Sequence, residues 1–207
     1  MKRFLEMINW KLVGIWVLMG VLLRIFNNQL TASQLPANLQ FVLAICLRVI
    51  FYWIVLRKYV QRIGLWSLAT IAGMLVVRLV HMNLGGLFDQ LYSDAIPILA
   101  AFLIFPLYGA FLMFIRAFFQ WIVLRKEVQR AYYWIIGSVV ANIIEGQLGS
   151  FLVFEWLSGS ISLPYFYIPS VEFIVYSVFL VITGMVMASL FPSVESTHNQ
   201  RLELETI

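Results

Sequence analysis

The chain has 207 residues, of which 62% are hydrophobic and 12% are charged, and its mean hydropathy is +0.91. Soluble proteins carry about 25% charged residues, so this composition excludes an ordinary soluble domain, whose water-exposed surface needs more charge. The net charge of +4 does not indicate nucleic acid, because the basic residues cluster beside apolar segments, where they set membrane orientation. Cys46 is the only cysteine, which excludes an internal disulfide and a cysteine-based metal site.

Six apolar segments follow one another along the chain, at about 9–27, 38–56, 63–83, 95–124, 131–150 and 171–191. Each is close to or longer than the ~20 residues that cross the ~30 Å hydrocarbon core as a helix. Helix is expected because lipid cannot satisfy unpaired backbone N–H and C=O groups. The sequence therefore predicts an all-α, polytopic transmembrane helix bundle of about six spans, surrounded by the lipid bilayer. This single transmembrane domain covers residues 1–192, and a polar tail follows at 193–207.

The connections between the segments differ in charge. The stretches RKYVQR (57–62) and RKEVQR (125–130) contain three basic residues each, whereas 27–38 and 83–94 contain no Lys or Arg. The positive-inside rule therefore places the two basic stretches in the cytoplasm. With six crossings, it places both termini there too, in a multi-pass protein of the cell (inner) membrane.

The stretch 151–173 is too apolar for an ordinary connection. It is interrupted by Gly159, Pro164 and Pro169, which disfavour a continuous helix. We expect an interfacial or re-entrant segment on the outer side of the membrane.

An internal duplication is the strongest pattern in the sequence. Residues 48–66 match residues 116–134 at a constant spacing of 68 residues, with 12 of 19 positions identical. Each copy covers the end of one span, a basic turn and the start of the next span. This predicts an internal parallel repeat of helix hairpins, in which spans two and three correspond to spans four and five. A weaker similarity between 20–27 and 74–81 leaves open a unit that is used three times.

The repeated stretch W-I-V-L-R-K-x-V-Q-R resembles a QWLVLRR-like motif of uncharacterised polytopic membrane proteins from cyanobacteria and other bacteria. Residues 120–125 (QWIVLR) carry the likeness best, and the first copy departs from it with Tyr52 in place of Gln. The resemblance covers about the central third of the chain. It implies a polytopic membrane protein without implying an activity.

A tryptophan and an arginine mark the cytoplasmic end of a span in each repeat copy. Trp53 and Trp121 precede Arg57 and Arg125, respectively, by four residues. An indole ring at this depth lies at the boundary between acyl chains and headgroups, so we expect both to be interfacial anchors rather than ligand-stacking groups. The two arginines are candidate contacts to anions or lipid headgroups.

Arg48 and Arg116 lie nine residues before those arginines, about 13 Å deeper along a helix. A charge at this depth is costly where it faces lipid. Either both side chains extend toward the cytoplasmic phosphates, or they form an inward-facing pair that binds an anionic group or a lipid headgroup. The sequence leaves both alternatives open.

Further polar residues lie in the outer halves of the predicted spans and form a candidate intramembrane polar site: Arg24, Arg78, His81, Asn142, Glu145 and Glu172. Arg78 and Glu145 occupy nearly equivalent repeat positions, which predicts an ion pair between the two copies. Asn142 and Glu145 are three residues apart and share one helix face. These groups form either a closed charge network that locks the helices together or a polar pocket open to the outside.

The sequence contains no HExxH, GxSxG or P-loop motif and no cluster with metal-ligand spacing, so we expect no catalysis, metal or cofactor. This favours a non-catalytic subunit or scaffold of a membrane complex, with other membrane-protein subunits or a second copy as partners. The alternative is a small transporter component or solute-binding membrane subunit with an outward-facing polar pocket. A closed bundle with paired charges would favour the first, and a cavity reaching Arg78, Asn142 and Glu145 the second.

Overall fold

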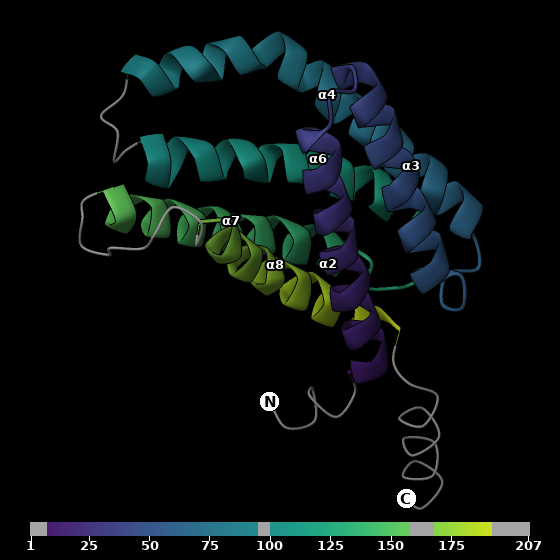
Figure 1. Cartoon of the computed structure of the whole chain (residues 1–207). Helices are drawn as coiled ribbons and strands as arrows, with labels where there is room; N and C mark the ends of the chain where they lie inside the picture. Colours follow the sequence, from purple (N-terminus) through teal and green to yellow (C-terminus); the bar gives the residue numbers. More distant parts are fainter. Residues whose placement is uncertain (1–7, 95–99, 158–167, 192–207) are drawn as a thin grey trace, which may run out of the picture.

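The computed structural model describes residues 8–94, 100–157 and 168–191 (Figure 1). No strand occurs within these three ranges. The elements are α2 (Trp10–Ala32), α3 (Ala37–Leu56), α4 (Ile63–Asp94), the π-helix η1 (Ala100–Ile104), α6 (Phe105–Leu124), α7 (Tyr132–Leu157) and α8 (Ile168–Leu190). Each of the six α-helices is long and apolar enough to cross a membrane, which confirms the predicted all-α bundle with six spans.

The six α-helices pack as a ring. α2 contacts α3, α3 contacts α4, and the series continues through α6, α7 and α8 back to α2. In Figure 1, α4, α6 and α7 lie side by side, and α2 lies across α8. Because each helix packs mainly on two neighbours, the centre of the ring is left for side chains or for a cavity.

One end of the ring carries the two basic turns, RKYVQR after α3 and RKEVQR after α6, and is called the basic end below. In each turn, a valine amide donates to the carbonyl of the leucine that ends the preceding helix. Val60 bonds to Leu56 (2.9 Å), and Val128 bonds to Leu124 (2.8 Å). The predicted turns are therefore present and share this backbone geometry.

A carboxylate joins the two turns. Glu127, in the second turn, accepts hydrogen bonds from the backbone N–H groups of Gln61 (2.9 Å) and Arg62 (2.7 Å), which lie just before α4. N–H groups at a helix start lie at the positive end of its dipole, where a carboxylate is favourable. The first turn has Tyr59 at the equivalent position, so the two turns are not interchangeable.

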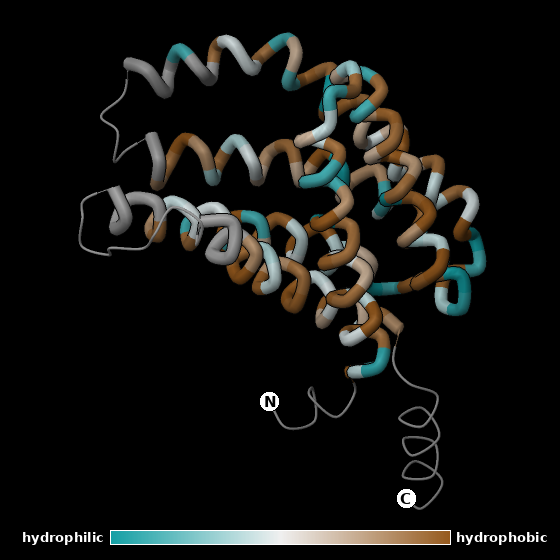
Figure 2. Tube along the Cα trace, in the orientation of Figure 1, coloured by the Kyte–Doolittle hydropathy of each residue, from teal (hydrophilic) through white to brown (hydrophobic). Residues whose placement is uncertain are grey.

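The hydrophobic core fills the basic end. Its most deeply buried members are Leu12, Leu56, Val60, Trp66, Ala117, Leu124, Ala131, Trp134 and Met187. Elsewhere, large apolar side chains such as Leu68, Leu79 and Phe111 remain exposed, which suits helices that face lipid rather than water. Figure 2 shows hydrophobic residues along the helices and hydrophilic residues at the basic turns. The protein is therefore a multi-pass membrane protein with one densely packed end.

α4 continues through the predicted connection at 83–94 and ends at Asp94, so this connection is helical. The candidate span within α4 runs from Ile63 to Leu87, close to the predicted 63–83. Leu84, Leu87 and Leu91 keep the three- and four-residue spacing of a helix face, and this periodicity outweighs the adjacent glycines at 85 and 86.

The interfacial segment expected at 151–173 is shorter than predicted. α7 extends to Leu157 and α8 begins at Ile168, so both flanks of the stretch are helical. Its middle, 158–167, lies outside the described residues.

Other predictions also fall outside the described residues. These are the N-terminal residues 1–7, the start of the predicted fourth span at 95–99, and the tail at 193–207. The described part of the fourth span begins with η1, which continues directly into α6. The repeat of whole hairpins and the cytoplasmic location of the basic end stay predictions.

Candidate functional site

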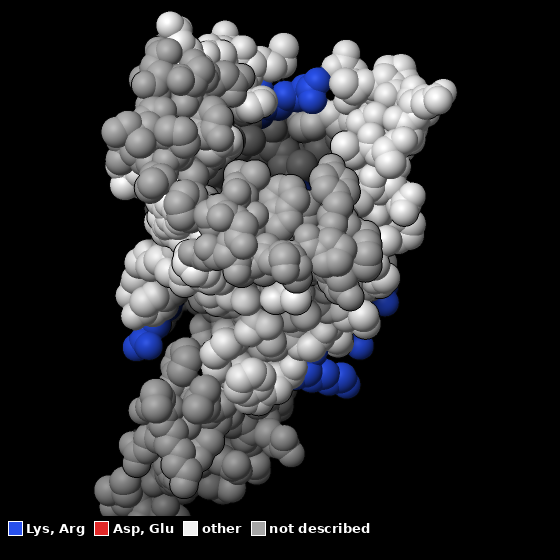
Figure 3. Space-filling model, turned by 60° about the vertical axis from the view of Figure 1, so that its left-hand side comes forward, with Lys and Arg blue, Asp and Glu red and all other residues white. Residues whose placement is uncertain are grey.

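The ring encloses a cavity of about 530 Å³ between α3, α4, α6, α7 and α8. This volume lies within the range of about 300–1,000 Å³ that is typical of small-molecule sites. The polar lining consists of Arg48, Tyr52, Arg78, His81, Arg116, Asn142, Glu145 and Tyr176. The apolar lining consists of Phe41, Met74, Val77, Leu112, Met113 and Phe179, with Gly109 between them. Figure 3 shows a hollow in the molecular surface with basic side chains at its rim.

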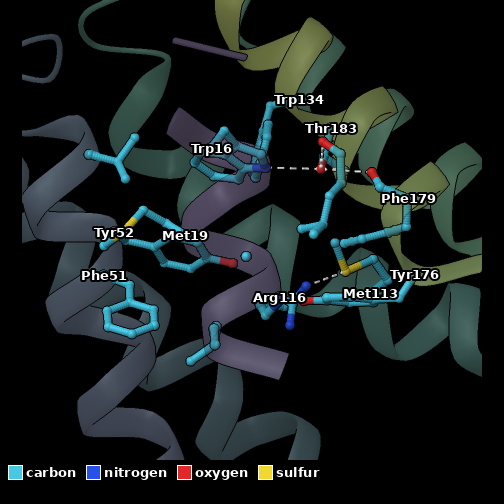
Figure 4. Close-up of a pocket in the computed structure, with 14 residues that line it drawn as sticks. Trp16, Met19, Phe51, Tyr52, Met113, Arg116, Trp134, Tyr176, Phe179 and Thr183 are labelled. Atoms are coloured by element: carbon cyan, nitrogen blue, oxygen red, sulfur yellow. Dashed lines mark hydrogen bonds between the residues drawn. The ribbon is translucent and has the colours of Figure 1, made fainter. Parts of the chain in front are cut away.

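Aromatic side chains separate this cavity from the basic end. Trp16 stacks on Tyr52 with ring centroids 5.2 Å apart, and it meets Trp134 edge to face at 5.8 Å. Tyr52 also contacts Trp66 edge to face at 5.1 Å. A second space of about 20 Å³, large enough for about one water, lies beside this aromatic floor (Figure 4). Tyr52 and Arg116 line both spaces, so the aromatic floor lies next to the cavity on the side of Arg116.

Arg48 and Arg116 come from equivalent positions of α3 and α6 and both line the cavity. Their described hydrogen-bond acceptors are thioethers: Arg116 Nη2 lies 2.8 Å from the sulfur of Met113, and Arg48 Nη1 lies 3.9 Å from the sulfur of Met74. The Nε atom of Arg48 is buried and has no hydrogen-bond partner among the described residues. Thioether sulfur is a weak acceptor, and the two guanidinium groups are close enough to repel each other. Glu145 is the one carboxylate among the described lining residues, and it interacts electrostatically with Arg116. The pair therefore carries more positive charge than this carboxylate can balance.

Arg78 and His81 lie on α4, toward the end of the cavity farther from the basic turns. Arg78 Nη2 donates to Asn38 Oδ1 at the start of α3 (2.7 Å), and its guanidinium carbon lies 4.3 Å from the centre of the Phe41 ring. The Nδ1 atom of His81 lies 2.8 Å from the hydroxyl oxygen of Tyr108 on α6. These contacts tie α4 to its two neighbours at the cavity wall.

Glu145 and Asn142 face the cavity from α7, as their shared helix face predicts. Glu145 interacts electrostatically with Arg24 and Arg116. Arg24 lies outside the cavity lining and places its guanidinium carbon 5.3 Å above the ring of Tyr176.

The predicted ion pair between Arg78 and Glu145 is replaced by other partners, although both residues line one cavity. Asn38, which bonds Arg78, begins α3 rather than the predicted repeat partner α7. Among the described lining residues there are three arginines and one glutamate, so their formal charges sum to +2.

Trp53, Trp121, Arg57 and Arg125 are absent from the described lining of the cavity. Trp53 is 42% exposed, and Arg125 places its guanidinium carbon 4.9 Å from the centre of the Trp121 ring near the basic end. Arg57 follows the end of α3 in the first basic turn. Glu172 lies in α8, but its side chain is outside the described part of the structure.

Sequence reasoning missed a buried polar network below the cavity. Gln120 is 1% exposed and donates to the hydroxyl of Thr70 (3.0 Å), while the indole N–H of Trp134 donates to Gln120 (2.9 Å). At the repeat spacing, Tyr52 takes the place of Gln120 and Trp66 takes the place of Trp134. The indole N–H of Trp66 is buried without a described hydrogen-bond partner, since no glutamine stands beside it. The Gln-to-Tyr difference between positions 120 and 52 was the sequence signal that could have revealed this network.

Among the described residues, no group of three His, Cys, Asp or Glu side chains could hold a metal ion. No known protein family matches the chain, and searches of curated proteins and of solved structures give no match either. The cavity and its side chains are therefore the basis on which a function can be argued.

Proposed function

We propose that this protein is a solute-binding membrane subunit, a small transporter component that binds an anion in the arginine-lined cavity. The observation that carries the proposal is the pair Arg48 and Arg116, which meet in the cavity with thioethers as their described hydrogen-bond acceptors. Charged side chains at this depth in a membrane protein are costly, and they mark ion or substrate sites by default.

The absence of catalytic motifs in the sequence favours a non-catalytic scaffold. A scaffold would be expected to close its charge network, because removing one partner of a buried pair is strongly destabilising and structural ions are therefore paired. Here the lining has a net charge of +2 and surrounds about 530 Å³ of space. Both features support the binding alternative, since an anion would supply the missing charge and occupy the space.

The direction of access follows from the predicted orientation. If the basic turns are cytoplasmic, the aromatic floor of Trp16, Tyr52, Trp66 and Trp134 lies between the cavity and the cytoplasm. The cavity then opens toward the outer side, as an outward-facing pocket requires. A solute would be captured from outside, and release to the cytoplasm would require the floor to move.

Ligand-dependent thermal stability tests this proposal. The purified protein in non-ionic detergent is heated with sodium phosphate, succinate, acetate or chloride at equal ionic strength, and unfolding is followed by tryptophan fluorescence. A ligand that binds the native state raises the Tm as its concentration exceeds Kd. We expect at least one of the oxyanions to raise the Tm above the chloride value.

Two double variants identify the site. Arg48→Gln with Arg116→Gln should abolish the oxyanion effect, whereas Lys58→Gln with Lys126→Gln removes an equivalent charge pair from the basic turns and should keep it. Equal Tm shifts in both double variants would contradict binding in the cavity. So would the absence of any oxyanion effect in the unmodified protein.

A further inference from the structure

Three helices each contribute one side chain to the cavity at the same number of residues before a buried core residue at the basic end. α3, α6 and α8 all end at the basic end, and each places one side chain eight residues before a fully buried residue of the core. These side chains are Arg48, Arg116 and Phe179, which precede Leu56, Leu124 and Met187. All three line the cavity. At this level the lining therefore combines two guanidinium groups with an aromatic ring.

The charge at this level favours a dianion over a monoanion. The lining has a net charge of +2 from its three arginines and Glu145, and a monocarboxylate would neutralise half of it. A phosphate monoester carries about −1.5 to −2 charges at pH 7 and three strong acceptor oxygens. Arginine forks bind phosphate oxygens bidentately, and an anion between Arg48 and Arg116 would remove their mutual repulsion.

The rest of the lining favours an attached apolar chain. Phe41, Met74, Val77 and Leu112 form apolar wall on α3, α4 and α6, and Phe179 adds a ring from α8. A small hydrophilic phosphate would leave this wall facing water inside the membrane. Methionine side chains adapt to irregular apolar ligands because they are flexible and polarizable.

We infer that the cavity binds an amphiphilic phosphate monoester, with its phosphate between Arg48 and Arg116 and its chain against the apolar wall. This inference rests on the proposed anion-binding function and names the ligand class. The ligand could enter from the bilayer as a lipid or from water as an organic phosphate, and chain length distinguishes these sources.

Isothermal titration calorimetry with three probes tests the inference. Decyl phosphate combines both features, decanoate keeps the chain with a monoanionic head, and butyl phosphate keeps the head with a short chain. Each is titrated below its micelle concentration into the full-length protein in non-ionic detergent. We expect the Kd of decyl phosphate to be at least about tenfold lower than that of either other probe.

The variants separate site binding from partition into the detergent. Arg48→Gln and Arg116→Gln should each weaken decyl phosphate binding about tenfold or more, while Lys58→Gln with Lys126→Gln should leave it unchanged. Arg48→Lys and Arg116→Lys keep the charge without the planar fork and should bind with intermediate affinity. Size-exclusion elution and Tm show whether each variant is folded.

Two results would overturn the ligand class while the proposed function stands. Decanoate binding as tightly as decyl phosphate, with the same sensitivity to the arginine variants, would show that the phosphate is not selected. Butyl phosphate binding as tightly as decyl phosphate would show a soluble ligand that makes no use of the apolar wall. If none of the probes and none of the simple oxyanions binds, the proposed function itself fails.

Discussion

The buried network around Gln120 allows a quantitative test of the packed end of the ring. Replacing Gln120 with Leu keeps a side chain of similar size but removes both of its hydrogen bonds. The hydroxyl of Thr70 keeps a second bond, because it donates to the backbone carbonyl of Trp66 (2.9 Å). The indole N–H of Trp134 keeps none, because Gln120 is its described acceptor.

The expected size of the effect follows from these two losses. Side-chain hydrogen bonds in membrane proteins contribute about 0.6 kcal/mol on average and about 1.7 kcal/mol at most. A buried donor left without an acceptor adds a penalty of about 1–3 kcal/mol. We therefore expect Gln120→Leu to lower the free energy of unfolding by about 2–3 kcal/mol, with the unpaired indole as the larger part.

A double-mutant cycle isolates the free-energy cost of the unpaired indole N–H of Trp134. Trp134→Phe removes the N–H group, so Gln120→Leu should be less destabilising by about 1–2 kcal/mol in the Trp134→Phe background than in the unmodified protein. Unfolding is measured in mixed micelles of non-ionic detergent and dodecyl sulfate, with circular dichroism as the signal. Trp66→Phe is the matched control, because this indole is equally buried and has no described acceptor.

The cycle with Trp66→Phe should be additive within about 0.5 kcal/mol. If Gln120→Leu and Trp134→Phe are also additive, Gln120 does not satisfy the indole N–H and the described network is wrong. If Trp66→Phe is as strongly coupled to Gln120→Leu as Trp134→Phe, the coupling reflects general packing.

Three further changes test the cavity, the turns and the orientation. Arg116→Met removes the repulsion between Arg116 and Arg48 and the desolvation cost of one buried charge, while Glu145 keeps Arg24 as a partner; the ligand-free protein should therefore be at least as stable, which thermal unfolding measures. Glu127→Gln weakens the carboxylate bridge to the start of α4 and should lower the free energy of unfolding by about 0.5–1 kcal/mol in denaturant titration. In a Cys46→Ser background, Gln129→Cys should react with a membrane-impermeant maleimide from the cytoplasmic side, and Asn28→Cys from the outer side.

Each of these changes has its own control or opposing outcome. A lower Tm for ligand-free Arg116→Met would mean that the arginine is structurally paired, contrary to the anion-site argument. Lys126→Gln, in the same turn as Glu127, should leave stability nearly unchanged, since surface charges contribute little. Labelling of both new cysteines from one side would contradict an odd number of crossings between the two positions, and reversed labelling would overturn the predicted orientation.

The spans could be predicted because membrane crossing depends on length and hydropathy, which a sequence displays directly. The length of α4 could not be predicted from the charge pattern. This pattern shows where Lys and Arg are absent, but it does not show where a helix ends. Residues 83–94 lack basic residues and contain two glycines, yet they are helical. The leucine spacing was the better guide there, since a helix continues while one face stays apolar.

The candidate site, too, could be predicted from the sequence only in part. Arg48 and Arg116 were identifiable because a charge deep in a membrane span is costly wherever it lies. The surroundings of these two arginines could not be predicted. Whether their side chains point to the cytoplasmic phosphates or into the ring depends on how α3 and α6 are rotated within the ring. The partner of Arg78 depends on the same geometry. It is Asn38 on the adjacent helix α3, whereas repeat spacing pointed to Glu145 on α7.

Residues 68 positions apart are alike in some parts of the ring and different in others. In the basic turns, most residues 68 positions apart are identical, and the packed core there tolerates little change of volume. Along the cavity wall they differ: Met74 of α4 matches Asn142 of α7, and Val77 matches Glu145. One wall is therefore apolar where the other is polar. A symmetric cavity would suit a symmetric ion, whereas this asymmetry suits a ligand with one charged end and one apolar end.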